Sequence, residues 1–100
     1  MANTIKALSR TAAATSSATL YTVPSATTTV VTNILVTNTS ASSQTFTITL
    51  DGVAAFSGAS IAANSTAMFD LKQALAATKI IAGYASATTV NFHVSGVEIV

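Results

Sequence analysis

The chain has 100 residues, a formal net charge of +1 and no cysteine, and only 7% of its residues are charged. A single domain of this length buries about two-thirds of its unfolded surface, and the absence of cysteine excludes disulfides and thiolate metal sites. The cations Lys6, Arg10, Lys72 and Lys79 form no cluster in the sequence. We therefore expect neither nucleic acid nor an anionic membrane as a partner.

The composition is unusually poor in charge and rich in small residues. About half of the chain is Ala, Ser or Thr, whereas a typical globular protein has about 25% charged residues. Low charge removes the repulsion that keeps proteins apart in solution. Either other subunits cover much of the exterior, or the hydroxyl groups alone keep the protein soluble; we favour the first alternative.

No apolar run approaches the roughly 18 residues that a membrane-spanning helix needs. The N-terminus also lacks the continuous apolar segment of a secretory signal. We expect the protein to be made in the cytoplasm and used without processing.

Residues 1–17 contain two large aliphatic residues beyond Met1, Ile5 and Leu8, and then continue as small ones. This composition predicts an extended or partly disordered N-terminal arm that becomes ordered across a neighbouring subunit; a frayed terminus without a role is the alternative. The arm supplies the candidate partner-interface residues Ile5, Lys6, Leu8 and Arg10.

The central element is predicted to be a strand over Thr28–Asn38, because Val, Ile and Thr favour a pleated sheet. A shorter strand precedes it and ends at Pro24. Both faces of the central strand carry apolar residues. Strict alternation places Val30, Thr32, Ile34 and Val36 on one face, and Val31, Asn33, Leu35 and Thr37 on the other. We expect Val30, Ile34 and Val36 to face the core, and Val31 and Leu35 to pack at one end or against a neighbouring subunit.

A hairpin follows. Gln44–Leu50 alternates with Phe46, Ile48 and Leu50 on one face. The dipeptide Asp51-Gly52 then favours a two-residue type I′ turn into a returning strand at residues 53–56.

Residues 57–64 are predicted to be irregular and to turn at Asn64-Ser65 into a strand over 66–71. Asp70 is a candidate N-cap for a short helix over 71–77 that closes one end of the fold.

Two further strands complete the chain, at 79–85 and 89–95, and Gly96 allows a bulge or kink before the last residues. In the second of these strands, Val90, Phe92 and Val94 are expected to point inward, and Asn91, His93 and Ser95 outward. The fold class is therefore all-β: an antiparallel β-sandwich of jelly-roll or immunoglobulin-like topology, with one short helix and the arm. Residues 18–100 form its single domain.

The residues that could carry chemistry are few. One His and three acidic residues, Asp51, Asp70 and Glu98, are too scattered to predict a metal site or a catalytic set. We expect no enzyme activity and no cofactor. Glu98 remains as a candidate interface pairing group for Lys6 or Arg10, and His93 is expected at the surface or an interface.

Several segments between residues 18 and 100 together resemble a known family. They are Leu20–Pro24, Val30–Ile34, Val36–Thr39, Ala62–Thr66, Asp70–Gln73 and Val94–Glu98. In combination they resemble small bacteriophage virion proteins, all-β modules on the outside of tailed-phage particles. Most of these are capsid decoration (cement) proteins, and some are tail or fibre components. The resemblance implies no catalytic or binding residues.

The resemblance and the composition together predict a capsid decoration protein. We expect it to be assembled in the host cytoplasm and to bind the major capsid protein or another virion protein on the outer capsid surface. We also expect a homo-oligomer, with a trimer favoured. The alternative is a tail or fibre component, or a host-surface or carbohydrate-binding module in which Tyr21 and Tyr84 supply the aromatic rings.

Overall fold

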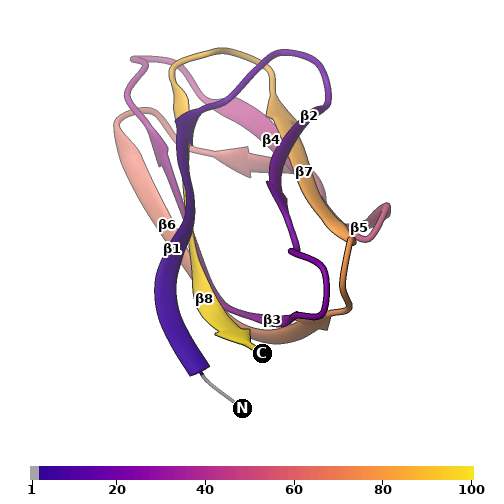
Figure 1. The fold of residues 1–100 in the computed structure, drawn as a ribbon. Coiled ribbons are helices and arrows are strands. Elements are labelled where there is room, and N and C mark those ends of the chain that lie inside the picture. The colour runs from indigo at the N-terminus through magenta and orange to yellow at the C-terminus, as the bar shows by residue number, and fades with distance from the viewer. Residues whose placement is uncertain (1–2) are drawn as a thin grey trace.

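The computed structural model describes residues 3–100, and these residues form eight β-strands and no helix (Figure 1). The strands are β1 (Asn3–Ala12), β2 (Ala18–Thr22), β3 (Thr28–Asn38), β4 (Gln44–Leu50), β5 (Val53–Ile61), β6 (Ser65–Leu75), β7 (Ile80–Ala85) and β8 (Val90–Ile99).

The strands form two antiparallel sheets of four strands each. One sheet has the order β1-β8-β3-β6 and is called the A sheet below; the other has the order β2-β7-β4-β5 and is called the B sheet. The molecule measures 46 × 21 × 17 Å along its principal axes. This is the β-sandwich-like, all-β architecture expected from the sequence.

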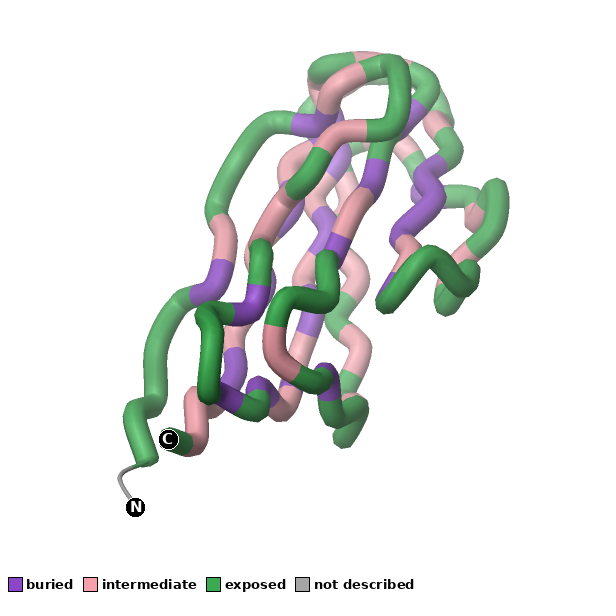
Figure 2. Tube along the Cα trace, turned by 45° about the vertical axis from the view of Figure 1, so that its right-hand side comes forward, coloured by how far each residue is buried: buried purple, intermediate pink, exposed green. Residues whose placement is uncertain are grey.

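The core lies between the two sheets. Buried positions alternate with half-buried or exposed ones along the strands (Figure 2), most regularly in β7 and in the first seven residues of β8. Phe46 of the B sheet is at the centre, with its ring centroid 6.2 Å from that of Phe69 and 6.2 Å from that of Phe92, both on the A sheet. Aromatic contacts thus join the two layers, as ring pairs at these distances do in protein cores.

The predicted hairpin is confirmed. Leu50 pairs with Val53 across a two-residue turn, in which Asp51 has φ 54° and Gly52 has φ 75°. Two successive positive φ values define the type I′ turn, whose twist matches that of the strands it joins. The returning strand is longer than expected, however: β5 continues to Ile61 and includes most of the segment predicted to be irregular.

The predicted helix over residues 71–77 is wrong, because β6 continues through this region to Leu75. Strand pairing with β3 reaches from Asn38↔Ser65 to Thr29↔Leu75, and Leu75 is buried in the core. A helix of seven residues is marginal alone, so the long ladder with β3 outweighs local helix propensity. Asp70 is consequently an exposed strand residue and caps no helix.

The segment expected to be an arm contributes an edge strand. Residues 3–12 form β1, paired with β8 from Asn3↔Ile99 to Ala12↔Asn91; residues 1 and 2 of the expected arm lie outside the described part. Because β1 pairs with β8 of its own chain, it is ordered without a neighbouring subunit.

The faces expected for β3 change at a bulge. Val31 pairs with Gly96 of β8 and Asn33 pairs with Ser95, so that Thr32 is an extra residue in β3. A bulge reverses the alternation beyond it. Val31 is therefore buried on the same face as Ile34, whereas Val30 lies on the outer face. The expectation that Val30 faces the core and Val31 does not was wrong.

Candidate functional site

All four predicted interface residues lie on β1, but they point in different directions. Leu8 is only 8% exposed and packs in the core. The ammonium group of Lys6 lies 3.3 Å from a carboxylate oxygen of Glu98 in the same chain. Ile5, which is 85% exposed, and Arg10 remain on the outer face of the A sheet. Of the predicted set, these two side chains are the ones free to contact a partner.

A polar network joins the two sheets near the end of β8. The phenol of Tyr21 on β2 donates a hydrogen bond to Glu98 on β8. It also lies 3.0 Å from the hydroxyl of Thr29 on β3, which is fully buried. Lys6 completes the network from β1. Four strands from both sheets are thus connected by side chains whose polar groups satisfy one another.

The network favours one charge state. The hydrogen bond from Tyr21 is the largest influence on Glu98 and holds the pKa of its carboxyl group below the usual 4.5. Burial opposes this shift, and the hydrogen bond and charge of Lys6 add to it. Burial and the adjacent carboxylate raise the pKa of Tyr21 above its usual 10.0. At neutral pH the network therefore contains a carboxylate, an ammonium group and a neutral phenol, which is a structural link rather than an acid–base pair.

Sequence reasoning gave Glu98 as an interface pairing group for Lys6 or Arg10, whereas the structure pairs it with Lys6 within the same chain. The role of Tyr21 was not expected. A signal was present in the alternation of β8. Because Val90, Phe92 and Val94 point inward, Gly96 and Glu98 share their face. An acidic residue on an inward-facing position requires a donor from the opposite layer, and Tyr21 supplies it.

A second buried polar group fixes the loop after β3. Asn38 is fully buried, and its amide nitrogen donates to the carbonyl oxygens of Ser42 at 2.8 Å, Ala62 at 3.2 Å and Ile61 at 3.4 Å. Its side-chain oxygen accepts a hydrogen bond from the Ser40 amide. The Asn-Thr-Ser sequence at this position resembles a glycosylation signal, but its side chain is committed to the fold.

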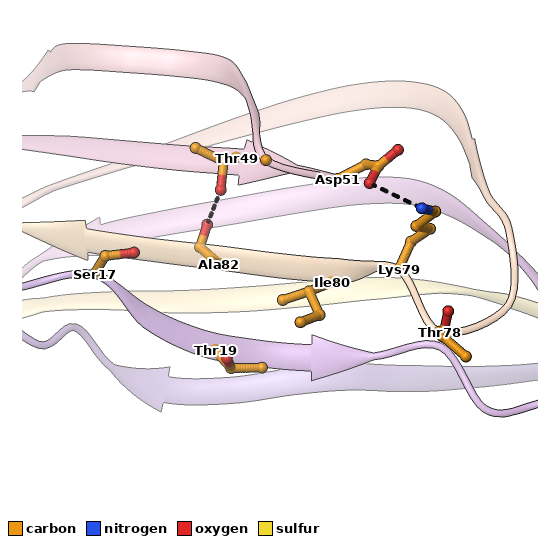
Figure 3. A pocket seen from close by; sticks show the side chains of 9 residues that line it. Ser17, Thr19, Thr49, Asp51, Thr78, Lys79, Ile80 and Ala82 are labelled. Carbon is orange, nitrogen blue, oxygen red and sulfur yellow. Dashed lines mark hydrogen bonds and ion pairs between the residues drawn. The ribbon is translucent and has the colours of Figure 1, made fainter.

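A shallow hollow of about 640 Å³ lies on the outer face of the B sheet (Figure 3). The ammonium group of Lys79 lies 3.8 Å from a carboxylate oxygen of Asp51 at its rim. The hydroxyl of Thr49 donates to the carbonyl of Ala82. Because its two charges face each other and its remaining polar groups are hydroxyls, the hollow offers no reactive set to a substrate.

The remaining candidates for chemistry are dispersed. Within residues 3–100, no three His, Asp or Glu side chains are close enough together to hold a metal ion. His93 alternates with the buried Phe92 and Val94 and lies half-buried on the outer face of the A sheet, as expected. No helix that could cross a membrane is present in this part of the chain.

The surfaces of the two sheets differ in charge. The strands β2, β4, β5 and β7 of the B sheet contain no charged residue at all. The A sheet carries Arg10 near one edge, on β1, and Asp70 and Lys72 on its other edge strand, β6.

Comparison of the sequence with protein-family models and with curated proteins gives no match. Any function therefore has to be inferred from these surfaces and from the fold.

Proposed function

We propose that this protein is a structural component of a bacteriophage virion, a capsid decoration protein that binds the outer capsid lattice. The single observation that carries this proposal is the uncharged B sheet. Four strands without one charged side chain, with the mutually paired Lys79 and Asp51 at the rim of their outer face, are unusual for a protein that stays dispersed in solution. A partner that covers this surface accounts for its composition.

The edge strand β5 supports the same conclusion. Natural proteins protect exposed edge strands with Lys, Pro or inward-pointing charges, because an open edge pairs with other chains. β5 has none of these and consists mainly of Ala, Ser and Gly, with Val53 71% exposed at its start. We infer that β5 and the outer face of the B sheet contact the virion partner.

The order of the strands is consistent with a viral role. We propose that the orders β1-β8-β3-β6 and β2-β7-β4-β5 are those of a jelly roll, the eight-stranded arrangement of two Greek keys. Jelly rolls occur in viral capsid proteins, and also in lectins and enzymes. The fold agrees with the proposal without deciding it, because one fold hosts many functions.

The test is binding to capsids. Purified protein is mixed with phage capsids that lack it, and the bound protein is measured by co-sedimentation. We expect saturable binding. Val53→Glu should weaken it, because the new charge lies on the open edge of β5. Ile5→Glu, on the A sheet, should leave the capsid affinity of each individual chain unchanged. Absence of binding overturns the proposal, whereas equal binding by both variants excludes the B sheet as the contact.

Tyr84 favours a second candidate function, a carbohydrate-binding module. Its ring lies on the outer face of the B sheet and is 38% exposed, whereas the hydroxyl of Tyr21 is engaged with Glu98. An exposed ring beside Thr47 could stack on a sugar. Glycan-array binding that Tyr84→Ala abolishes would establish this function in place of capsid binding.

A further inference from the structure

We propose that the outer face of the A sheet is a self-complementary surface, on which a second copy of this chain docks about a two-fold axis parallel to the strands. The inference concerns a different sheet from the proposed virion contact. It holds whether or not the protein is a virion component.

The strand pairing places an apolar row across the full width of this face. Ile5 of β1 pairs with Val97 of β8, Val97 pairs with Val30 of β3, and Val30 pairs with Ala74 of β6. Residues directly opposite each other in a sheet share a face. Ile5 is 85% exposed at one end of the row and Ala74 is exposed at the other, whereas Val97 and Val30 between them are half-buried. The row is therefore apolar from edge to edge and most accessible at its two ends.

A second row lies further along the strands and contains charge. Arg10 pairs with His93, His93 pairs with Leu35, and Leu35 pairs with Met68, which is 62% exposed. Asp70 lies two residues from Met68 on the same strand and belongs to the neighbouring row. The outer face thus has the cation Arg10 on its β1 edge, and the anion Asp70 followed by the cation Lys72 on its β6 edge.

Neither Arg10 nor Asp70 has an ion-pair partner within residues 3–100. Among residues 3–100, the ion pairs are Lys6–Glu98 and Lys79–Asp51. In a chain with so few charges, Arg10, Asp70 and Lys72 are the ones left outside a pair, and all three are on strands at the edges of the A sheet.

A two-fold axis brings the opposite charges together. When two such sheets face each other about an axis parallel to their strands, each row stays level with itself while the two edges exchange places. β1 of one copy then lies over β6 of the other. Arg10 faces the Met68 row of its partner, one row, or about 7 Å, from Asp70. Lys72 is beyond Asp70, on the side away from Arg10.

The same operation buries the apolar row. Val97 of one copy faces Val30 of the other at the centre, and Ile5 covers Ala74 at each edge. The charge pair and the apolar contact each occur twice, as in any two-fold interface. This charge complementarity identifies the occupant as a second copy, and it favours a dimer over the trimer expected from the sequence.

The area is sufficient for a stable pair. Four strands about 4.8 Å apart and about ten residues long present a face of roughly 600 Å². Two such faces bury about 1,200 Å² in total, which is at the lower limit of specific protein interfaces. We therefore expect a dimer that dissociates measurably on dilution.

The experiment is sedimentation equilibrium on the full chain, with the dissociation constant of the pair as its result. Arg10→Asp places two acidic groups together and should weaken the dimer about ten-fold or more. The double variant with Arg10→Asp and Asp70→Arg restores opposite charges and should recover most of that loss. A merely destabilising substitution would not be rescued in this way.

A matched pair of exposed aliphatic residues provides the control. Ile5→Glu should weaken the dimer, whereas Val53→Glu, at a similarly exposed position on the B sheet, should not. Circular dichroism of each variant verifies that the fold is retained. A monomer at all concentrations, a trimer, or a dimer insensitive to Ile5→Glu and Arg10→Asp would overturn the inference. These measurements of self-association leave the test of capsid binding by an individual chain unaffected.

Discussion

The phenol of Tyr21 and the carboxylate of Glu98 form a hydrogen bond that joins the two sheets of this sandwich. Tyr21 lies on β2 and Glu98 on β8, 77 positions apart in the chain. The core between the layers consists mostly of Val, Ile and Phe, so this contact is a polar link between two otherwise apolar surfaces. Partly buried polar contacts of this kind are sensitive to the loss of either partner.

The first prediction concerns acid stability. The pKa of Glu98 is lowered in the folded protein, so the unfolded chain takes up this proton first as the pH falls. The stabilisation from Glu98 is complete well above pH 4.5 and is lost as the pH falls below that value. Tyr21→Phe removes the largest cause of the shift. In urea titrations between pH 7 and pH 3, we expect the variant to show a weaker pH dependence of its unfolding free energy than the wild type.

Tyr21→Phe should also change how the unfolding free energy depends on pH above pH 10. The pKa of Tyr21 is raised in the folded state, so its contribution is present below pH 10 and is lost as the pH rises above it. Tyr84→Phe, whose hydroxyl makes no hydrogen bond within residues 3–100, is the matched control. If Tyr84→Phe reduced the pH dependence of the unfolding free energy between pH 7 and pH 3 as much as Tyr21→Phe does, the network would have no role in acid stability.

The second prediction concerns Asn38. Asn38→Ala leaves the carbonyls of Ser42, Ile61 and Ala62 without their shared donor in a buried site. We expect a loss of about 3 kcal/mol in the free energy of unfolding. Asn33→Ala on the same strand, at a half-buried outer position, should change it by less than about 0.5 kcal/mol. Equal effects in chemical denaturation would show that the Asn38 bonds contribute no special stability.

The third prediction concerns the close approach of strands at Gly96. A methyl group at this position would overlap the carbonyl oxygen of Val30 and lie 2.9 Å from a methyl carbon of Leu8. Gly96→Ala should therefore destabilise the protein by about 2 to 3 kcal/mol. Gly58→Ala has open space around it, and at φ 57° it should cost only about 1 kcal/mol. Thermal unfolding in which Gly58→Ala is the more damaging change would contradict this assignment.

Local residue preferences were sufficient to predict much of the fold. The β-branched run at Thr28–Asn38 has the predicted bounds, and Asp51-Gly52 makes the predicted turn. The inward set of β8 is also confirmed. In each case, the residues that determine the structure are neighbours in the chain.

The errors arise where distant residues decide. Residues 71–75 have good helix propensity, but β3 offers them a complete strand ladder. The bulge at Thr32 lies beside the close approach of the β3 backbone to Gly96. The residue sequence of β3 alone does not predict this bulge. Likewise, the pairing of β1 with β8 depends on residues about 90 positions away. The Tyr21 network was missed for the same reason, since its members come from four strands.

The most direct measurement of the central claim is a cryo-electron microscopy reconstruction of the purified virion. The account predicts density for an eight-stranded sandwich on the outer capsid surface, repeated with the lattice, with β5 and the uncharged B sheet against the capsid protein. A reconstruction at side-chain resolution with no such sandwich on the capsid would contradict it.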